Sequence, residues 1–118
     1  MSGGGTTDLN LVIAGSLTTG VTSGLTDVSV FSNNGGSFQY IFTFGGGTSA
    51  GNVYIETSND GTNWSLYPSS TLAYTSATTN HVIQVEKFGT KFVRAVVTNT
   101  SGTGGTVNVL AHLIQNPR

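Results

Sequence analysis

The segment Ser37–Phe44, with the sequence SFQYIFTF, alternates between two kinds of side chain. Successive side chains of a β-strand point to opposite faces of a sheet, so residues two apart share a face. One face of this segment carries both polar and apolar side chains, and the other carries only aromatic side chains. The pattern predicts a β-strand whose aromatic face, formed by Phe38, Tyr40, Phe42 and Phe44, lies in a hydrophobic core.

Seven further segments on either side of this one are also predicted to be strands. They are rich in β-branched and aromatic residues, and Gly, Asn, Asp or Ser turns separate them. Their ranges are Leu9–Ala14, Asp27–Phe31, Asn52–Ser58, Thr62–Tyr67, His81–Glu86, Lys91–Thr98 and Thr106–Gln115. No segment has the 3.6-residue apolar period of a helix. Because the connections are of hairpin length, we expect an all-β fold, an antiparallel β-sandwich that is jelly-roll-like and has about eight strands.

The length of 118 residues suits one domain. Residues 1–24 are expected to be a flexible N-terminal segment or arm, because Gly3–Gly5 is a run of glycines and Gly15–Gly24 is rich in Gly, Thr and Ser. Residues 25–118 are expected to form the β-sandwich domain. An arm of this kind predicts that deleting residues 1–24 leaves the domain folded.

Low charge is the most unusual property of the composition. Charged residues make up 8% of the chain and its net charge is -1, whereas about 25% is average for globular proteins. We expect no nucleic-acid partner, since Lys87, Lys91 and Arg94 form too small a basic cluster to follow a phosphate backbone. No apolar segment is long enough to cross a membrane as a helix. A neutral surface suits permanent protein contacts, although drift toward strand-forming and turn-forming residues would give the same composition.

The last predicted strand is apolar on both faces. Val107, Val109, Ala111 and Leu113 share one face, and Leu110, His112 and Ile114 share the other. A sheet with one face in water alternates between apolar and polar residues, so something is expected to cover the second face. Either the N-terminal segment of the same chain, which is the simpler cover, or another subunit would do so. Leu110, His112 and Ile114 are therefore candidate subunit contacts.

No combination of residues predicts catalysis or metal binding. The acidic residues have no partner at catalytic spacing, and Asp60 lies in an Asn-Asp-Gly turn, where Asp is favoured for backbone reasons. His81 and His112 lack the spacing of a metal motif, and the chain has no cysteine. We expect no enzymatic activity, no catalytic residues, no metal and no cofactor.

Four aromatic residues close in sequence favour a different kind of site. Tyr54, Trp64, Tyr67 and Tyr74 would be able to stack on sugar rings if they face outward. The alternative is that Trp64 packs in the core, as a single tryptophan in a small sandwich commonly does.

Two parts of the chain resemble a known family. Residues 51–64 (GNVYIETSNDGTNW) have the form of a strand followed by S-x-D-G-x-x-W, and residues 91–98 (KFVRAVVT) lead through a glycine-rich turn into residues 106–113. Both are similar to hairpins of small β-sandwich virion structural proteins of tailed bacteriophages. The similarity covers a little over half the chain and leaves out the part up to about Gly47.

The resemblance implies a non-enzymatic virion structural protein. Its expected role is that of a capsid decoration (cement) protein that forms a homo-oligomer, a trimer or a dimer. It would contact the major capsid protein or other virion proteins, and would be located in the virion after assembly in the host cytoplasm. A tail or fibre component, or a carbohydrate-binding β-sandwich module, is the alternative, because related hairpins occur in such proteins too.

Overall fold

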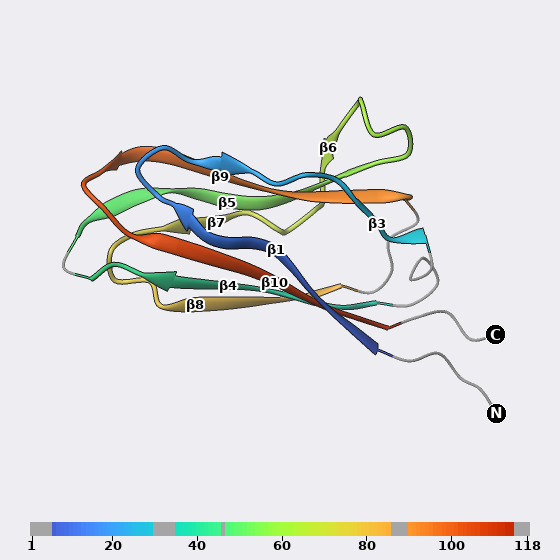
Figure 1. The fold of residues 1–118 in the computed structure, drawn as a ribbon, viewed down its shortest axis with the longest axis horizontal. Coiled ribbons are helices and arrows are strands. Elements are labelled where there is room, and N and C mark those ends of the chain that lie inside the picture. The colour runs from blue at the N-terminus through green and yellow to red at the C-terminus, as the bar shows by residue number, and fades with distance from the viewer. Residues whose placement is uncertain (1–5, 30–34, 46, 86–89, 115–118) are drawn as a thin grey trace.

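The computed structural model describes residues 6–29, 35–45, 47–85 and 90–114, and these form an all-β fold of ten strands in two antiparallel sheets (Figure 1). Sheet A contains, in spatial order, β1 (Thr6–Ser16), β10 (Thr106–Ile114), β4 (Gly36–Thr43) and β8 (Asn80–Val85). Sheet B is built around β9 (Phe92–Gly102) and β5 (Ser49–Ser58). Short strands form its edges: β2 (Val21–Thr22) and β3 (Thr26–Asp27) beside β9, and β6 (Ser65–Leu66) and β7 (Leu72–Tyr74) beside β5.

The strand order is that of a jelly roll. Both β2 and β3 pair with one side of β9, and both β6 and β7 pair with one side of β5, so each couple occupies a single strand position. The described strands then fill eight positions, numbered along the chain, in the orders 1-8-3-6 for sheet A and 2-7-4-5 for sheet B. This arrangement wraps two Greek keys around one core. The prediction of an antiparallel, jelly-roll-like sandwich of about eight strands is confirmed.

The core lies between the two sheets, where the alternation of β4 places it. Phe38, Tyr40 and Phe42 are buried, and they lie across the sandwich from Val53 and Ile55 of sheet B. Burying each such side chain contributes about 1.5–3 kcal/mol. The aromatic face predicted for residues 37–44 is therefore the inner face of sheet A, with Phe44 packed against the edge of the core.

The predicted N-terminal arm is wrong for its described residues. Strand β1 pairs with β10 from Thr6 to Ser16, and Figure 1 shows it beside β10 in the same layer. Val12 and Leu17 are part of the core. A β-bulge at this point lets Leu11 and Val12, neighbours in sequence, both contact the core. The boundary at residue 24 therefore does not separate an arm from the sandwich.

The predicted strands differ in extent from those observed: β1, β5 and β9 are longer than expected, and three other segments differ as follows. The segment 62–67 contributes only β6, because the Asp60 turn continues to Asn63 before pairing resumes. The segment 27–31 contributes Asp27 to β3, and its residues 30 and 31 lie outside the described ranges. The segment 81–86 corresponds to β8, with Glu86 outside the described ranges.

Candidate functional site

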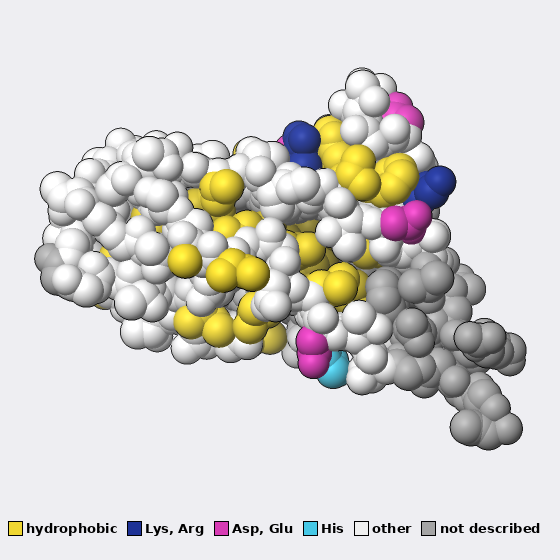
Figure 2. Space-filling model, viewed as in Figure 1, with side chains coloured by type: hydrophobic (Ala, Val, Ile, Leu, Met, Phe, Trp, Pro, Cys, Tyr) yellow, Lys and Arg dark blue, Asp and Glu magenta, His cyan; other side chains and the backbone are white. Residues whose placement is uncertain are grey.

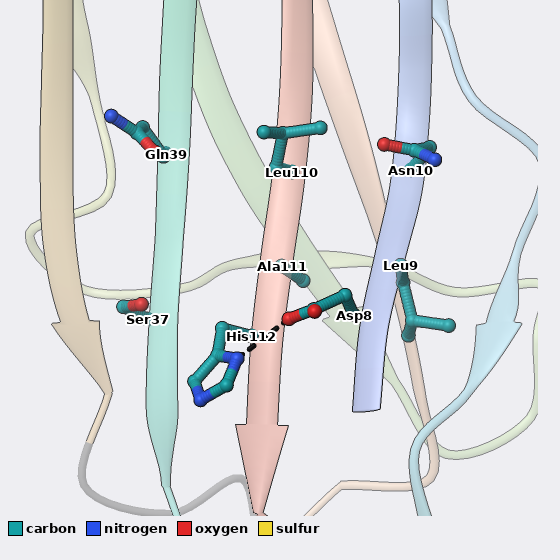
Figure 3. A pocket seen from close by; sticks show the side chains of 8 residues that line it. All are labelled: Asp8, Leu9, Asn10, Ser37, Gln39, Leu110, Ala111 and His112. Atoms are coloured by element: carbon teal, nitrogen blue, oxygen red, sulfur yellow. Dashed lines mark hydrogen bonds and ion pairs between the residues drawn. The ribbon is translucent and has the colours of Figure 1, made fainter. Parts of the chain in front are cut away.

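The outer surface of sheet A, called the A face, consists of alternate residues from neighbouring strands. Strand pairing places Asn10, Leu110, Gln39 and Val82 in one row across the sheet. A second row contains Asp8, His112, Ser37 and Gln84, and Ile41 and Ile114 lie on the same face. A depression lies on this face. Figure 3 shows Leu110 on the strand between those of Gln39 and Asn10, and the side chains of Asp8 and His112 directed toward one another.

The A face carries exposed apolar side chains. Val82 is 46% exposed and Ile114 is 41% exposed, and Leu110 and Ile41 are half-buried. Within the described ranges no segment lies over them. The expectation that the chain's own N-terminal segment covers this face is wrong for residues 6–16, which extend sheet A at its edge. Contact with another subunit through Leu110, His112 and Ile114 stays a prediction.

The A face is also nearly without net charge. Nδ1 of His112 lies 2.6 Å from Oδ1 of Asp8, so these two groups balance one another when the imidazole is protonated. Apart from His81, which lies on the inner side of β8 opposite Tyr40, the other acidic and basic side chains of the described residues belong to sheet B and its loops: Asp27, Glu56, Asp60, Lys91 and Arg94. Figure 2 shows charged side chains gathered around a hydrophobic patch near β6, while most of the remaining visible surface is uncharged.

The outer surface of sheet B, called the B face, holds an aromatic and charged cluster. The guanidinium carbon of Arg94 lies 4.2 Å from the centre of the Trp64 ring, and Arg94 Nε donates to Glu56 Oε1 at 2.8 Å. A guanidinium over an indole ring is attracted by the negative face of the ring. The expectation that Trp64 packs in the core is wrong. The ring is half-buried on the surface. Trp64 lies two residues before Leu66, which pairs with Glu56, so Trp64 and Glu56 are on the same side of the sheet.

The four aromatic residues predicted for sugar stacking separate in the structure. Tyr74 is buried, and its hydroxyl donates to the carbonyl oxygen of Thr98 at 3.0 Å. Burial raises the pKa of Tyr74. Tyr67 packs against the core. Tyr54 and Trp64 lie on the B face, so the structure keeps two of the four as surface candidates.

A hollow beside Tyr54 follows from the interrupted edge of sheet B. Strand β6 ends at Leu66 and β7 begins at Leu72, and the chain between them is exposed at Pro68 and Ser69 and buried at Ser70. The fully buried hydroxyl of Ser70 accepts from the N–H of Ile55 at 3.0 Å, which replaces the missing ladder bond. Tyr40 then donates to the carbonyl oxygen of Ser70 at 2.8 Å, and burial raises the pKa of this phenol. The gap left at the surface is lined by Asn52, Tyr54, Glu56, Leu66 and Thr71.

Sequence reasoning missed the residues that shape this hollow. Ser70 and Thr71 lie in a polar segment that resembles an ordinary loop. Asn52 was placed in a strand without a role. No local signal distinguishes Ser70 from the other serines, because its importance comes from contacts with Ile55 and Tyr40, which are 15 and 30 residues away.

The described residues include no metal-binding cluster, and Asp60 serves a turn. No group of three or more His, Cys, Asp or Glu side chains that could hold a metal ion occurs among them. The Asp60 carboxylate accepts from the N–H groups of Thr62 and Asn63, both at 2.8 Å. These hydrogen bonds hold the pKa of Asp60 below its usual range. Asp60 thus closes a turn, as predicted. The part of the chain that the structure describes contains no helix that could cross a membrane.

Comparison with known proteins identifies the fold. The strand order defines an antiparallel jelly-roll sandwich. The chain is similar in structure to the SPBc2 prophage-derived protein YomS, with a TM-score of 0.64 over 95% of both chains. The two sequences are 13% identical, so this likeness concerns the fold. No protein-family model matches the chain, and no curated protein matches it in sequence.

Proposed function

We propose that this chain is a non-enzymatic structural protein of a phage particle that decorates the capsid through its A face. The proposal depends on one observation: among the described residues, the A face combines exposed apolar side chains with a net charge near zero. Burying the exposed side chains of Val82 and Ile114 would stabilise an interface by about 25 cal/mol for each Å² of apolar surface removed from water. Contact between the A face and a second protein would provide this stabilisation.

The charge distribution supports contact through sheet A. An ion buried in an interface without a partner is strongly unfavourable, and the A face carries only the mutually paired Asp8 and His112 among the described residues. The groups Glu56, Arg94 and Lys91 lie on the sheet B side, where they keep that side hydrated. The proposed orientation therefore places sheet A against the shell or a sister subunit and sheet B toward solvent.

The likeness to a prophage-derived protein supports a phage origin. The resemblance of the two hairpins supports a virion structural protein, and the small size of the chain favours the decoration role. Each copy offers a modest contact area. Many copies on a repeating shell gain stability through effective concentration, because one bound contact holds the next in place. A homo-oligomer, a trimer or a dimer, would tie neighbouring capsid subunits together.

The test compares two Leu→Asp variants at half-exposed positions. Leu110→Asp places a carboxylate in the A face, and Leu25→Asp places one on the sheet B side, where Leu25 is 50% exposed. Light scattering should show an oligomer for the wild type and for Leu25→Asp, and a monomer for Leu110→Asp. Phage head shells that lack the protein should sediment with the first two and not with the third.

A wild-type protein that stays monomeric and does not sediment with shells would contradict the proposal. Equal behaviour of the two variants would contradict the assignment to the A face. Immunogold electron microscopy of intact particles separates the head role from the alternative: label over tails or fibres would favour a tail or fibre component that uses the same surface.

A further inference from the structure

The hollow beside Tyr54 on the B face has the features of a small-molecule site. About 420 Å³ of space, open to solvent, is lined by Asn52, Tyr54, Glu56, Leu66 and Thr71, and this volume is within the range of about 300–1,000 Å³ found for ligand pockets. A stable protein interface involves about 20–30 residues on each side, whereas five residues line this hollow. Its occupant is therefore a small molecule or one end of a chain-like ligand.

The hollow combines an aromatic ring with polar groups that have no partner. Tyr54 Oη, the Asn52 side-chain amide and the Thr71 hydroxyl make no hydrogen bond to other described residues. In Glu56, the bond from Arg94 goes to Oε1 and leaves Oε2 without a partner in the described chain. The site thus offers donors from Asn52, acceptors from Glu56 and hydroxyls that do both.

The charge of the site selects a neutral ligand. The Arg94 guanidinium balances the Glu56 carboxylate at 2.8 Å, so neither an anion nor a cation gains a large electrostatic attraction here. Trp64 holds Arg94 from its other side, which fixes the direction of the carboxylate. Leu66 adds an apolar wall that is 51% exposed. An uncharged molecule with both C–H faces and hydroxyl edges matches this set of groups.

We propose that the hollow binds a neutral oligosaccharide. The C–H face of one sugar ring stacks on Tyr54, because the negative face of an aromatic ring attracts weakly positive hydrogens. Hydroxyl groups of the sugar donate to Glu56 Oε2 and exchange hydrogen bonds with Asn52 and Thr71. Ser70, tethered to Ile55 and Tyr40, keeps the broken edge open before the ligand arrives, which reduces the entropy lost on binding.

This site lies on the sheet opposite the A face and does not depend on the proposed assembly role. Either proposal fails without affecting the other, since one is measured by oligomeric state and shell binding and the other by sugar binding. The two are compatible, because a protein held through sheet A leaves sheet B accessible.

The experiment is a titration of the full-length, isotopically labelled protein, followed by amide chemical shifts. The probes are cellotetraose, maltotetraose, mannotetraose and chitotetraose, with sialyllactose as the charged comparison. At least one neutral tetrasaccharide should shift the amides of Asn52, Tyr54 and Thr71. Tyr54→Ala should weaken that binding by about two- to tenfold, as expected for loss of an aromatic contact. Gln84→Ala, on the A face, is the control and should bind as the wild type does.

Several outcomes would overturn the proposal. The first is that no neutral sugar causes amide shifts at about 10 mM, which excludes low-millimolar dissociation constants. The second is that the shifts map to residues away from the hollow. The others are that only sialyllactose binds, or that Tyr54→Ala binds the sugar as tightly as the wild type does. If Tyr54→Ala does not fold, Asn52→Ala and Tyr54→Phe decide instead. The first should lose affinity and the second, which keeps the ring, should retain most of it.

Discussion

Replacement of Ser70 by alanine tests the tether that shapes the broken edge of sheet B. Its hydroxyl accepts from the Ile55 N–H at 3.0 Å and is fully buried. In Ser70→Ala the carbonyl of Ile55 keeps its bond from the Tyr67 N–H at 2.8 Å, but the Ile55 N–H loses its partner. A buried donor without a partner costs about 1–3 kcal/mol. We expect the free energy of unfolding to fall by that amount.

The assay is thermal and urea unfolding followed by circular dichroism. With an unfolding entropy of about 2.1 cal/mol/K per residue, a chain of 118 residues loses about 4 °C of Tm for each kcal/mol. Ser70→Ala should therefore melt about 4–12 °C below the wild type. The control is Ser76→Ala in an exposed turn, which should change stability by less than about 0.5 kcal/mol.

A double-mutant cycle with Tyr40→Phe sharpens the test. Tyr40→Phe removes the bond to the Ser70 carbonyl oxygen, and the two changes act on one tether, so their effects should not add. If Ser70→Ala is as stable as Ser76→Ala, or if the double variant shows simple additivity, the tether does not hold the edge as described.

Three further predictions concern other parts of the fold. Deleting residues 1–24 should abolish the cooperative melting transition, because β1 is a strand of sheet A; a folded, cooperative truncated protein would restore the arm interpretation. Gly51→Ala should destabilise by about 1–3 kcal/mol in urea unfolding, since a Cβ there would collide with the Thr98 carbonyl oxygen, whereas Gly24→Ala meets open space and should be neutral or slightly stabilising. The lowered pKa of Asp60 stabilises the folded state when the carboxylate is ionised, so the advantage of the wild type over Asp60→Asn should be full above the unfolded pKa of about 3.9. That advantage should shrink in urea unfolding as the pH falls below this value, and an advantage that does not change with pH would contradict the assignment.

The strands that could be predicted are those with a long period-two pattern. Residues 37–44 and 106–115 alternate over eight or more residues, and they became β4 and β10 with boundaries shifted by a residue or two. The sequence pattern does not predict the short edge strands β2 and β7, and it predicts β3 only at Asp27, because two or three residues hold too little pattern and their pairing is decided by β9 and β5. The arm was a wrong prediction because Gly and Thr suit both loops and bulged strands.

The candidate sites show the same division. The alternation of the last strand predicts its apolar outer face, and with it the A face residues Leu110, His112 and Ile114. The sequence predicts only some of the residues that line the B face hollow. Aromatic residues close in sequence indicated it, yet alternation did not separate outward Tyr54 from buried Tyr74, which sit on different strands paired through Gly51.

Sequence by itself determined that this chain is an all-β sandwich with little charge and an apolar outer face on its last strand. These properties follow from local alternation and composition, which do not depend on tertiary contacts. Only the tertiary structure decided that the N-terminal strand lies beside β10, that Trp64 is on the surface under Arg94, and that Ser70 props open a hollow beside Tyr54. Each of these depends on residues 15 to more than 100 positions apart, and the free energy of such contacts exists only once the sheets have paired.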